Sequence, residues 1–330
     1  MPIIITLELL RRVHNKPDTK HAKIDIGGAI LGALGLAGPV FALIEQPHWG
    51  WSSPLIYGPL VAGLLLLVAF VLYERRIDHA MLPPGIFKNH NFSVGNIATL
   101  GIYAALGVST FIIVVFLQQV SGYSAVQAGL ALLPVTIIMF FLSSRFGALA
   151  GKYGPRLFMG FGPLVAAAGF LLMLRVQAHV DYWTELFPAV LIFGLGLSMT
   201  VAPLTSAILG DVKSSEAGIA SAVNNAISRV ASLVAIAGVG AIMATQFSST
   251  IDRNISCFKA SSAAITTAKQ ATLITTPPKP YQNNAAFHDA LVSASVSAFH
   301  VSLETTAALL VIGGGVSLIG IKNPRILKKN

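Results

Sequence analysis

Hydrophobic positions run in long blocks along this chain, and short polar segments separate them. The longest block lies between Lys88 and Arg145, where 56 consecutive residues include no Asp, Glu, Lys or Arg. A polar run at 118–123 interrupts this block in its middle. A helix needs about 20 apolar residues to cross the hydrocarbon core of a bilayer. The block therefore predicts two membrane-spanning helices joined by a short turn.

The remaining hydrophobic blocks follow the same pattern and bring the predicted number of membrane-spanning helices to eight. Only 11% of the residues are charged, whereas soluble globular domains carry roughly 25%. The sequence therefore predicts an all-α polytopic membrane protein. The eight spans are expected at 26–44, 55–73, 95–117, 126–150, 157–174, 186–209, 219–243 and 305–321.

Polar segments between the spans divide the chain into four parts. The apolar residues 3–10 in the first part are either the tail of a truncated span or the start of an amphipathic helix. Pro83 and Pro84 mark the clearest boundary along the chain. The four parts are a basic segment at 1–25, a two-helix membrane hairpin at 26–73, a cytoplasmic linker at 74–94 and a six-helix domain at 95–330.

The six-helix domain is expected to carry one long outer loop at 246–300. Residues 246–284 are rich in Ser, Thr, Ala and Pro, a composition typical of loosely ordered segments. Residues 285–303 are expected to form a surface helix that leads into the eighth span.

Basic residues are distributed unevenly between the two sides of the predicted bundle. Sixteen of the 22 fall in segments of one side, whereas the short segments of the opposite side hold only Arg175. Short cytoplasmic segments of membrane proteins are enriched in Lys and Arg. We therefore expect both termini to be cytoplasmic. The same pattern accounts for the net charge of +9, so we expect no binding to nucleic acid.

Signatures of enzymes, cofactor sites and metal sites are not found in the sequence. G-x-S-x-G, H-E-x-x-H and phosphate-loop patterns are missing. The eight histidines are scattered, and Cys257 is the single cysteine. We therefore expect neither a catalytic activity nor a cofactor or metal ion.

Polar residues form a stripe on the otherwise apolar seventh span. Ser221, Asn225, Ser228, Arg229 and Ser232 recur at helical spacing. Arg229 lies about ten residues into this span, or roughly 15 Å at 1.5 Å per residue. A charged residue inside a span usually faces the bundle interior or a water-filled cavity. Two interpretations remain open: the stripe lines a substrate cavity, or Arg229 snorkels or pairs with backbone carbonyl groups on the cytoplasmic side.

Two glutamines, Gln118 and Gln119, end the third span at its outer face. They are either solvated residues at the helix end or residues that line an outward opening. No acidic residue lies deep in any predicted span. Proton coupling usually requires a carboxyl group within the membrane that can change its charge.

A glycine-rich basic loop joins the fourth and fifth spans on the predicted cytoplasmic side. Its glycines allow a tight turn, and its basic residues can pair with the C-terminal ends of helices and latch one conformation. The alternative is an ordinary basic turn. The candidate residues of this conformational loop are Gly147, Gly151, Lys152, Gly154 and Arg156.

Four sequence motifs resemble the major facilitator superfamily, specifically the C-terminal part of fourteen-span EmrB/QacA-type drug:proton antiporters. The sequence GALAGKYGPR at 147–156 resembles the loop motif of the C-terminal half. Three further segments resemble the start of the tenth span, the twelfth span and the start of the thirteenth span. They are GYSAVQAGLALLP at 122–134, GLGLSMTVAP at 194–203 and AGIASAVNNAISR at 217–229.

This resemblance implies a major-facilitator-like helical bundle in the inner (plasma) membrane that exports hydrophobic or cationic small molecules. It implies membrane lipid as a partner, the proton gradient as energy source, and a missing N-terminal six-helix half. Gly151 stands where the family's loop motif has Asp, which weakens a charge-relay role for this loop. Two hypotheses follow: a truncated or split efflux transporter, or a non-transporting scaffold or remnant of one.

Overall fold

The computed structural model describes residues 25–77, 82, 84–213, 216–255, 262–270, 273, 275–279 and 281–323. Within these ranges, eight helical segments are long and apolar enough to cross a membrane. The predicted all-α, eight-span class is therefore confirmed. The helices are α2 (Ile26–Trp49), α3 (Pro54–Glu74), α4 (His90–Gln119), α5 (Ala125–Ala131), α6 (Leu133–Tyr153), α7 (Pro155–Leu172), α8 (Phe187–Gly210), α9 (Ala217–Ile255), α10 (Ser262–Gln270) and α11 (Ala285–Gly320).

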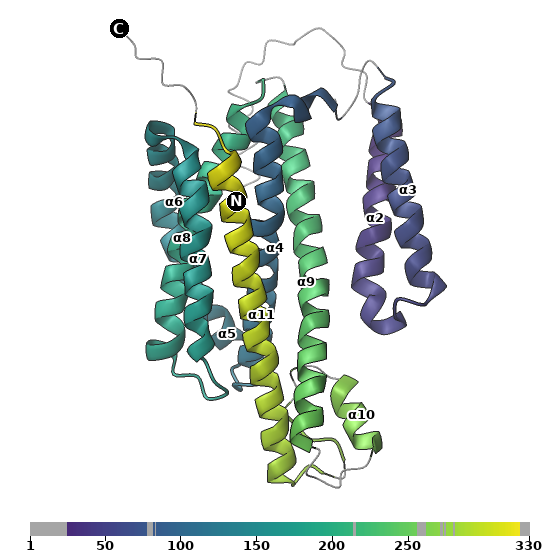
Figure 1. The fold of residues 1–330 in the computed structure, drawn as a ribbon, viewed down its shortest axis with the longest axis vertical. Coiled ribbons are helices and arrows are strands. Elements are labelled where there is room, and N and C mark those ends of the chain that lie inside the picture. Colours follow the sequence, from purple (N-terminus) through teal and green to yellow (C-terminus); the bar gives the residue numbers. More distant parts are fainter. Residues whose placement is uncertain are drawn as a thin grey trace, which may run out of the picture.

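Six of the spans form a bundle, and the hairpin of α2 and α3 stands beside it (Figure 1). Helices α7 and α8 pack together, α11 packs against α4, α7 and α9, and α2 reaches α9. We call the end of the bundle that carries Gly154 the turn end. The opposite end, where Figure 1 shows α10, is called the α10 end.

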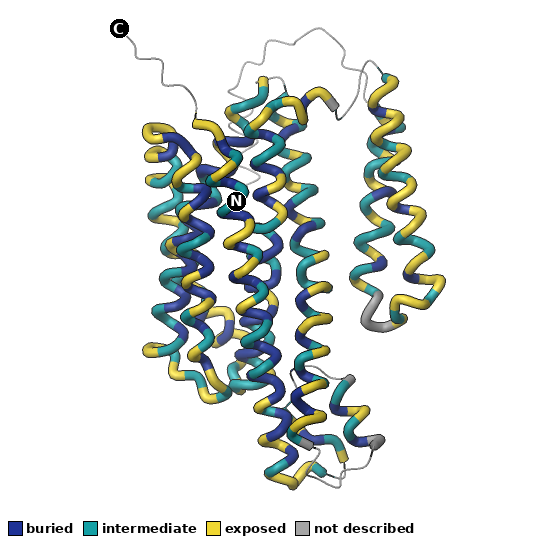
Figure 2. Tube along the Cα trace, viewed as in Figure 1, coloured by how far each residue is buried: buried dark blue, intermediate teal, exposed yellow. Residues whose placement is uncertain are grey.

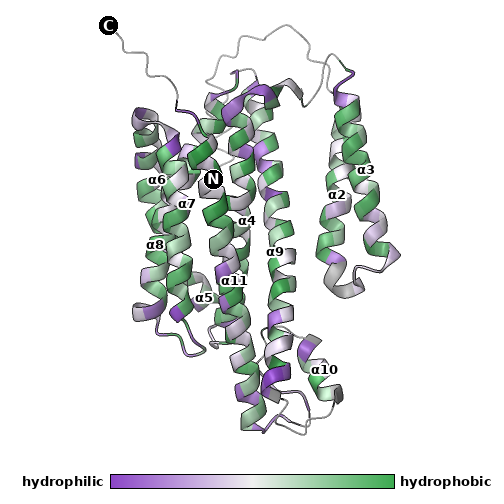
Figure 3. Cartoon of the chain, in the orientation of Figure 1, coloured by the Kyte–Doolittle hydropathy of each residue, from purple (hydrophilic) through white to green (hydrophobic). Residues whose placement is uncertain are grey.

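Buried residues concentrate on the sides of the bundle helices that face each other (Figure 2). The rings of Phe116 on α4 and Phe299 on α11 stack with their centroids 3.9 Å apart. Outward positions on α6 are apolar yet open, and Phe140 is 79% exposed. Figure 3 shows that hydrophobic residues dominate the long helices of the bundle and the hairpin, whereas α10 is more mixed. Such a surface suits contact with lipid, which cannot hydrogen-bond to polar groups.

Glycines allow the two helices of the hairpin to approach closely. A Cβ atom on Gly38 would lie 2.2 Å from the backbone oxygen of Pro59, and one on Gly63 would lie 2.3 Å from Cδ of Pro39. Small residues at helix contacts are typical of membrane proteins, where close packing replaces the hydrophobic effect between helices.

The predicted fourth span consists of two helices rather than one. Helix α5 ends at Ala131, and α6 begins at Leu133 with Pro134 in its first turn. Proline has no backbone N–H group, so it cannot donate the hydrogen bond that would continue α5 into α6.

The prediction of a long outer loop at 246–300 is wrong for both of its ends. Helix α9 continues to Ile255, and α11 begins at Ala285. The helix expected at 285–303 is present, and it continues without a break into the eighth span. The physical reason is apolar spacing: Phe247 and Ile251 repeat at a helical interval and are fully buried. Phe287 and Leu291 of α11 belong to the same hydrophobic cluster.

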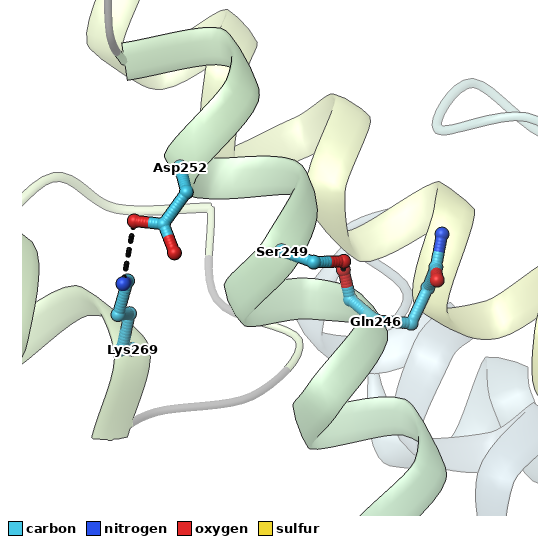
Figure 4. Close-up of polar contacts among 4 residues, drawn as sticks. All are labelled: Gln246, Ser249, Asp252 and Lys269. Atoms are coloured by element: carbon cyan, nitrogen blue, oxygen red, sulfur yellow. Dashed lines mark hydrogen bonds and ion pairs between the residues drawn. The ribbon is translucent and has the colours of Figure 1, made fainter.

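Polar contacts accompany this cluster at the α10 end (Figure 4). Lys269 of α10 forms an ion pair with Asp252 of α9, with 2.5 Å between Nζ and Oδ1. The Oγ hydroxyl of Ser249 donates to the backbone oxygen of Gln246. The side-chain amide of Gln246 donates to the hydroxyl of Ser297 on α11 at 2.8 Å. Polar contacts therefore connect α9 to both α10 and α11 at this end of the bundle.

Candidate functional site

An open pocket of about 770 Å³ lies between α4 and α9. Its wall combines apolar side chains with hydroxyl, amide and guanidinium groups. Helix α4 contributes one side of the pocket, and α9 contributes the other. The lining residues are Tyr103, Leu106, Gly107, Thr110 and Phe111 of α4, and Asn225, Ser228, Arg229, Ser232, Leu233 and Ile236 of α9.

Side-chain hydrogen bonds fix the position of α9 against α4. The amide of Asn224 donates to Oδ1 of Asn96 at 3.1 Å and to Oγ1 of Thr99 at 2.9 Å. About two turns further from the turn end, the hydroxyl of Ser232 donates to the backbone oxygen of Tyr103 at 2.8 Å. Asn224 points toward α4, and Asn225, the next residue along α9, faces the pocket.

The backbones of the two helices approach closely at Gly107. A Cβ atom there would lie 2.5 Å from Cβ of Ser232, a separation that folded proteins do not tolerate. Glycine at this position therefore sets the spacing between α4 and α9, and with it the depth of the pocket.

Arg229 is exposed and is the one charged residue among those that line the pocket. It lies twelve residues after the first residue of α9, or about 18 Å along the helix axis. Within the described part of the chain, no hydrogen bond or ion pair reaches its guanidinium or the amide of Asn225. Tyr103 lies on the α4 side of the same pocket. The backbone-carbonyl pairing considered from the sequence is therefore not seen among these residues.

Three of the predicted site residues lie outside this pocket. Ser221 is on α9, but it is not among the lining residues. Gln118 and Gln119 lie at the α10 end of α4. The amide of Gln118 donates to the backbone oxygen of Val114 at 3.4 Å, and the backbone oxygen of Gln119 accepts from the hydroxyl of Thr275 at 3.4 Å. The structure therefore does not bring the glutamines together with Arg229.

Sequence reasoning missed the residues that α4 contributes to the site. Asn96, Thr99, Tyr103 and Thr110 recur at intervals of three, four and seven along one face of α4. This is the same kind of polar stripe that identified the seventh span. A search of every span for polar residues at helical spacing would have found it.

The candidate conformational loop contacts the C-terminal end of α11. Gly154 forms the whole connection between α6 and α7 and has a φ of +90°. A Cβ atom there would collide with the side chain of Asn323. The backbone N–H of Arg156 donates to Oδ1 of Asn323 at 3.1 Å, and its Nε donates to the backbone oxygen of Leu318.

A second pocket, of about 350 Å³, lies beside this loop at the turn end. Gly147 and Gly151 line it, whereas Lys152 lies outside it, with its ammonium group 5.3 Å from the ring centre of Tyr153. Across the pocket, the carboxylate of Asp211 accepts hydrogen bonds from the first backbone N–H groups of α4, including that of Asn91 at 2.7 Å. Asn91 in turn exchanges two hydrogen bonds with the backbone of Lys322.

A sequence model of the Major Facilitator Superfamily matches residues 25–236 of the chain. The chain belongs to this superfamily. The membership predicted from the four motifs is therefore confirmed, and the chain is a multi-pass membrane protein of a family of transporters.

Relatives of this superfamily member include proteins named for antibiotic resistance. The puromycin resistance protein pur8 of Streptomyces alboniger is 33% identical over 65% of this chain and 43% of its own length. The methylenomycin A resistance protein of Bacillus subtilis is 29% identical over 70% of this chain and 50% of its own length. The tetracenomycin C resistance and export protein of Streptomyces glaucescens is 28% identical over 67% of this chain and 41% of its own length. The chain thus spans half or less of the length of these relatives.

Proposed function

We propose that this protein takes part in proton-coupled export of small, drug-like molecules, and that the pocket between α4 and α9 is its part of the substrate pathway. The observation that carries the proposal is the polar wall around Arg229 in an otherwise apolar membrane bundle. Ionisable residues within membrane spans are rare, almost always face the bundle interior or a water-filled cavity, and mark substrate or ion pathways. The names of the antibiotic-resistance relatives support the same class of substrate.

The pathway needs a second wall, which we propose is a further six-helix unit on the same or another polypeptide. Major facilitator transporters move by rocking two such units around a central site. The face of α9 that carries Asn225 and Arg229 is open toward the pocket, and the relatives are at least twice as long as the part they share with this chain. No acidic residue is among those that line the pocket, so we assign the proton-carrying carboxyl group to the other unit.

The loop at the turn end is proposed to latch one conformation of the transporter. Arg156 joins the start of α7 to the end of α11, so a movement of either helix would break this contact. Following the distribution of basic residues, we place the turn end and both termini in the cytoplasm, and the bundle in the inner (plasma) membrane.

An accumulation assay tests the transport proposal. The chain would be expressed in cells that lack their own exporters, alone and together with any six-span reading frame found immediately upstream of its gene. We expect the pair to lower the cellular accumulation of at least one of puromycin, methylenomycin and tetracenomycin, and a proton uncoupler to abolish the effect. If no combination changes accumulation of puromycin, methylenomycin or tetracenomycin, the proposal fails, and a non-transporting scaffold becomes the better interpretation.

Labelling of introduced cysteines tests whether the pocket is part of a pathway. In a Cys257→Ser background, Asn225→Cys should react with a membrane-impermeant maleimide, because the pocket is open to water. Phe140→Cys on the outer side of α6 is the matched control and should stay unlabelled in a bilayer. Equal labelling of the two variants would contradict a water-filled pocket.

A further inference from the structure

The charge of the pocket between α4 and α9 restricts which molecules can bind there. Arg229 is the one charged residue among the lining residues, and its guanidinium makes no hydrogen bond or ion pair with the described residues. The guanidinium gives the pocket a positive charge. This charge would attract a bound anion and repel a bound cation.

The serine and threonine hydroxyl groups of the pocket already donate hydrogen bonds to backbone oxygens. Ser228 donates to the backbone oxygen of Asn224 at 2.7 Å, and Ser232 donates to that of Tyr103. The hydroxyl of Thr110 donates to the backbone oxygen of Leu106 at 3.0 Å. Among the described lining residues, the side-chain donors left for a bound molecule are therefore the guanidinium of Arg229, the amide of Asn225 and the phenolic hydroxyl of Tyr103.

Arg229 and Asn225 lie four residues apart on α9, so their side chains project from the same face of the helix. Arginine carries five N–H donors in a planar fork and no acceptor, and this fork matches the two oxygens of a carboxylate. Apolar side chains complete the wall. They are Leu106 and Phe111 of α4 and Leu233 and Ile236 of α9.

We propose that this pocket binds amphiphilic molecules that carry an oxyanion, such as a carboxylate, on an apolar body. The oxyanion pairs with Arg229 and accepts a further hydrogen bond from Asn225, while the apolar body lies against the α4 side. This inference rests on the proposed function and narrows its substrate class. The family resemblance implied hydrophobic or cationic substrates, whereas this inference specifies amphiphilic anions.

Three pyrene probes of one scaffold test the charge preference: 1-pyrenebutyrate, its methyl ester and the (pyrenylbutyl)trimethylammonium ion. The full chain would be placed in phosphatidylcholine nanodiscs, and binding would be followed by pyrene fluorescence after subtraction of empty nanodiscs. Wild-type protein is expected to bind the carboxylate about tenfold more tightly than the ester, because only the carboxylate offers Arg229 a charged hydrogen-bond acceptor.

Variants of Arg229 connect this preference to the pocket. Arg229→Gln should bind the carboxylate and the ester equally, and Arg229→Lys should keep part of the preference because it retains the charge but not the planar fork. Arg175→Gln is the matched control: it removes one arginine charge at the far end of α7 and should behave like wild type.

The outcomes separate this inference from the transport proposal. The inference is overturned if the ammonium probe binds more tightly than the carboxylate, if all three probes bind equally, or if the carboxylate preference survives in Arg229→Gln. In each of these cases, an effect in the accumulation assay would still support transport. The absence of saturable binding by any probe also overturns it. If phosphatidylglycerol in the nanodiscs abolishes carboxylate binding in an Arg229-dependent way, the oxyanion belongs to a lipid headgroup, and the assignment to a soluble substrate is wrong.

Discussion

Replacing Gly107 by alanine should push α4 and α9 apart at the candidate site. The new Cβ atom would lie 2.5 Å from Cβ and 2.9 Å from Cα of Ser232, so no side-chain rotation relieves the contact. Overpacking of this kind costs about 1–3 kcal/mol. Loss of the hydrogen bond from Ser232 to the backbone oxygen of Tyr103 would add about 0.6 kcal/mol, the average found for side-chain hydrogen bonds between membrane helices.

Gly238→Ala is the matched control, because Gly238 also lies inside a membrane helix and a Cβ atom there would meet nothing within 4 Å. Both substitutions gain about 1 kcal/mol of helix propensity, and this gain cancels in the comparison. Gly107→Ala should therefore be less stable than Gly238→Ala by about 1–3 kcal/mol. Unfolding in mixed micelles with increasing SDS, followed by far-UV circular dichroism, measures this difference. Equal stability of the two variants would refute the close approach of α4 and α9 at this point.

Three further predictions use the same unfolding assay. Asn224→Ala should lower the free energy of unfolding by about 1 kcal/mol, because it removes two hydrogen bonds to α4. Asn225→Ala should change it little. A larger loss for Asn225→Ala than for Asn224→Ala would show that Asn225, and not Asn224, faces α4. Gly154→Ala should lower the free energy of unfolding by about 1–3 kcal/mol, because Gly154 has a φ of +90°. Gly151→Ala should not destabilise the protein, because a Cβ atom there meets open space. Equal stability of these two variants would argue against the tight turn at Gly154. Asp252→Asn should change the free energy of unfolding by less than about 1 kcal/mol, because the Asp252 side chain is 58% exposed, and a larger loss would mean that the ion pair holds α10 in place.

Hydropathy was sufficient to predict the eight spans because a bilayer admits few structures other than apolar helices of about 20 residues. It was not sufficient beyond the bilayer. Phe247 and Ile251 continue α9 into a segment whose average composition is polar, and composition averaged over that segment hides their helical spacing. The break before Pro134 was missed because a proline in a span can also be tolerated within one continuous helix.

The sequence predicted the residues that α9 contributes to the candidate site, but not those that α4 contributes. Arg229 stands out in the sequence because a charge inside a span is rare, and Asn225 follows from helical spacing. Tyr103 and Thr110 belong to another span, and their place opposite Arg229 depends on which helices pack together. Helical spacing also does not decide whether Asn224 or Asn225 faces α4. That choice depends on partners on another helix, Asn96 and Thr99.

The contacts at the turn end have a consequence for how the protein is made. Arg156 and Asn91 find their partners at residues 318–323, so they emerge from the ribosome more than 150 residues before those partners. During membrane insertion, the start of α4 and the turn between α6 and α7 must wait until α11 has entered the bilayer. The polar contacts that close this end of the bundle therefore form late in biogenesis, and they report that the last helix has been inserted in the correct orientation.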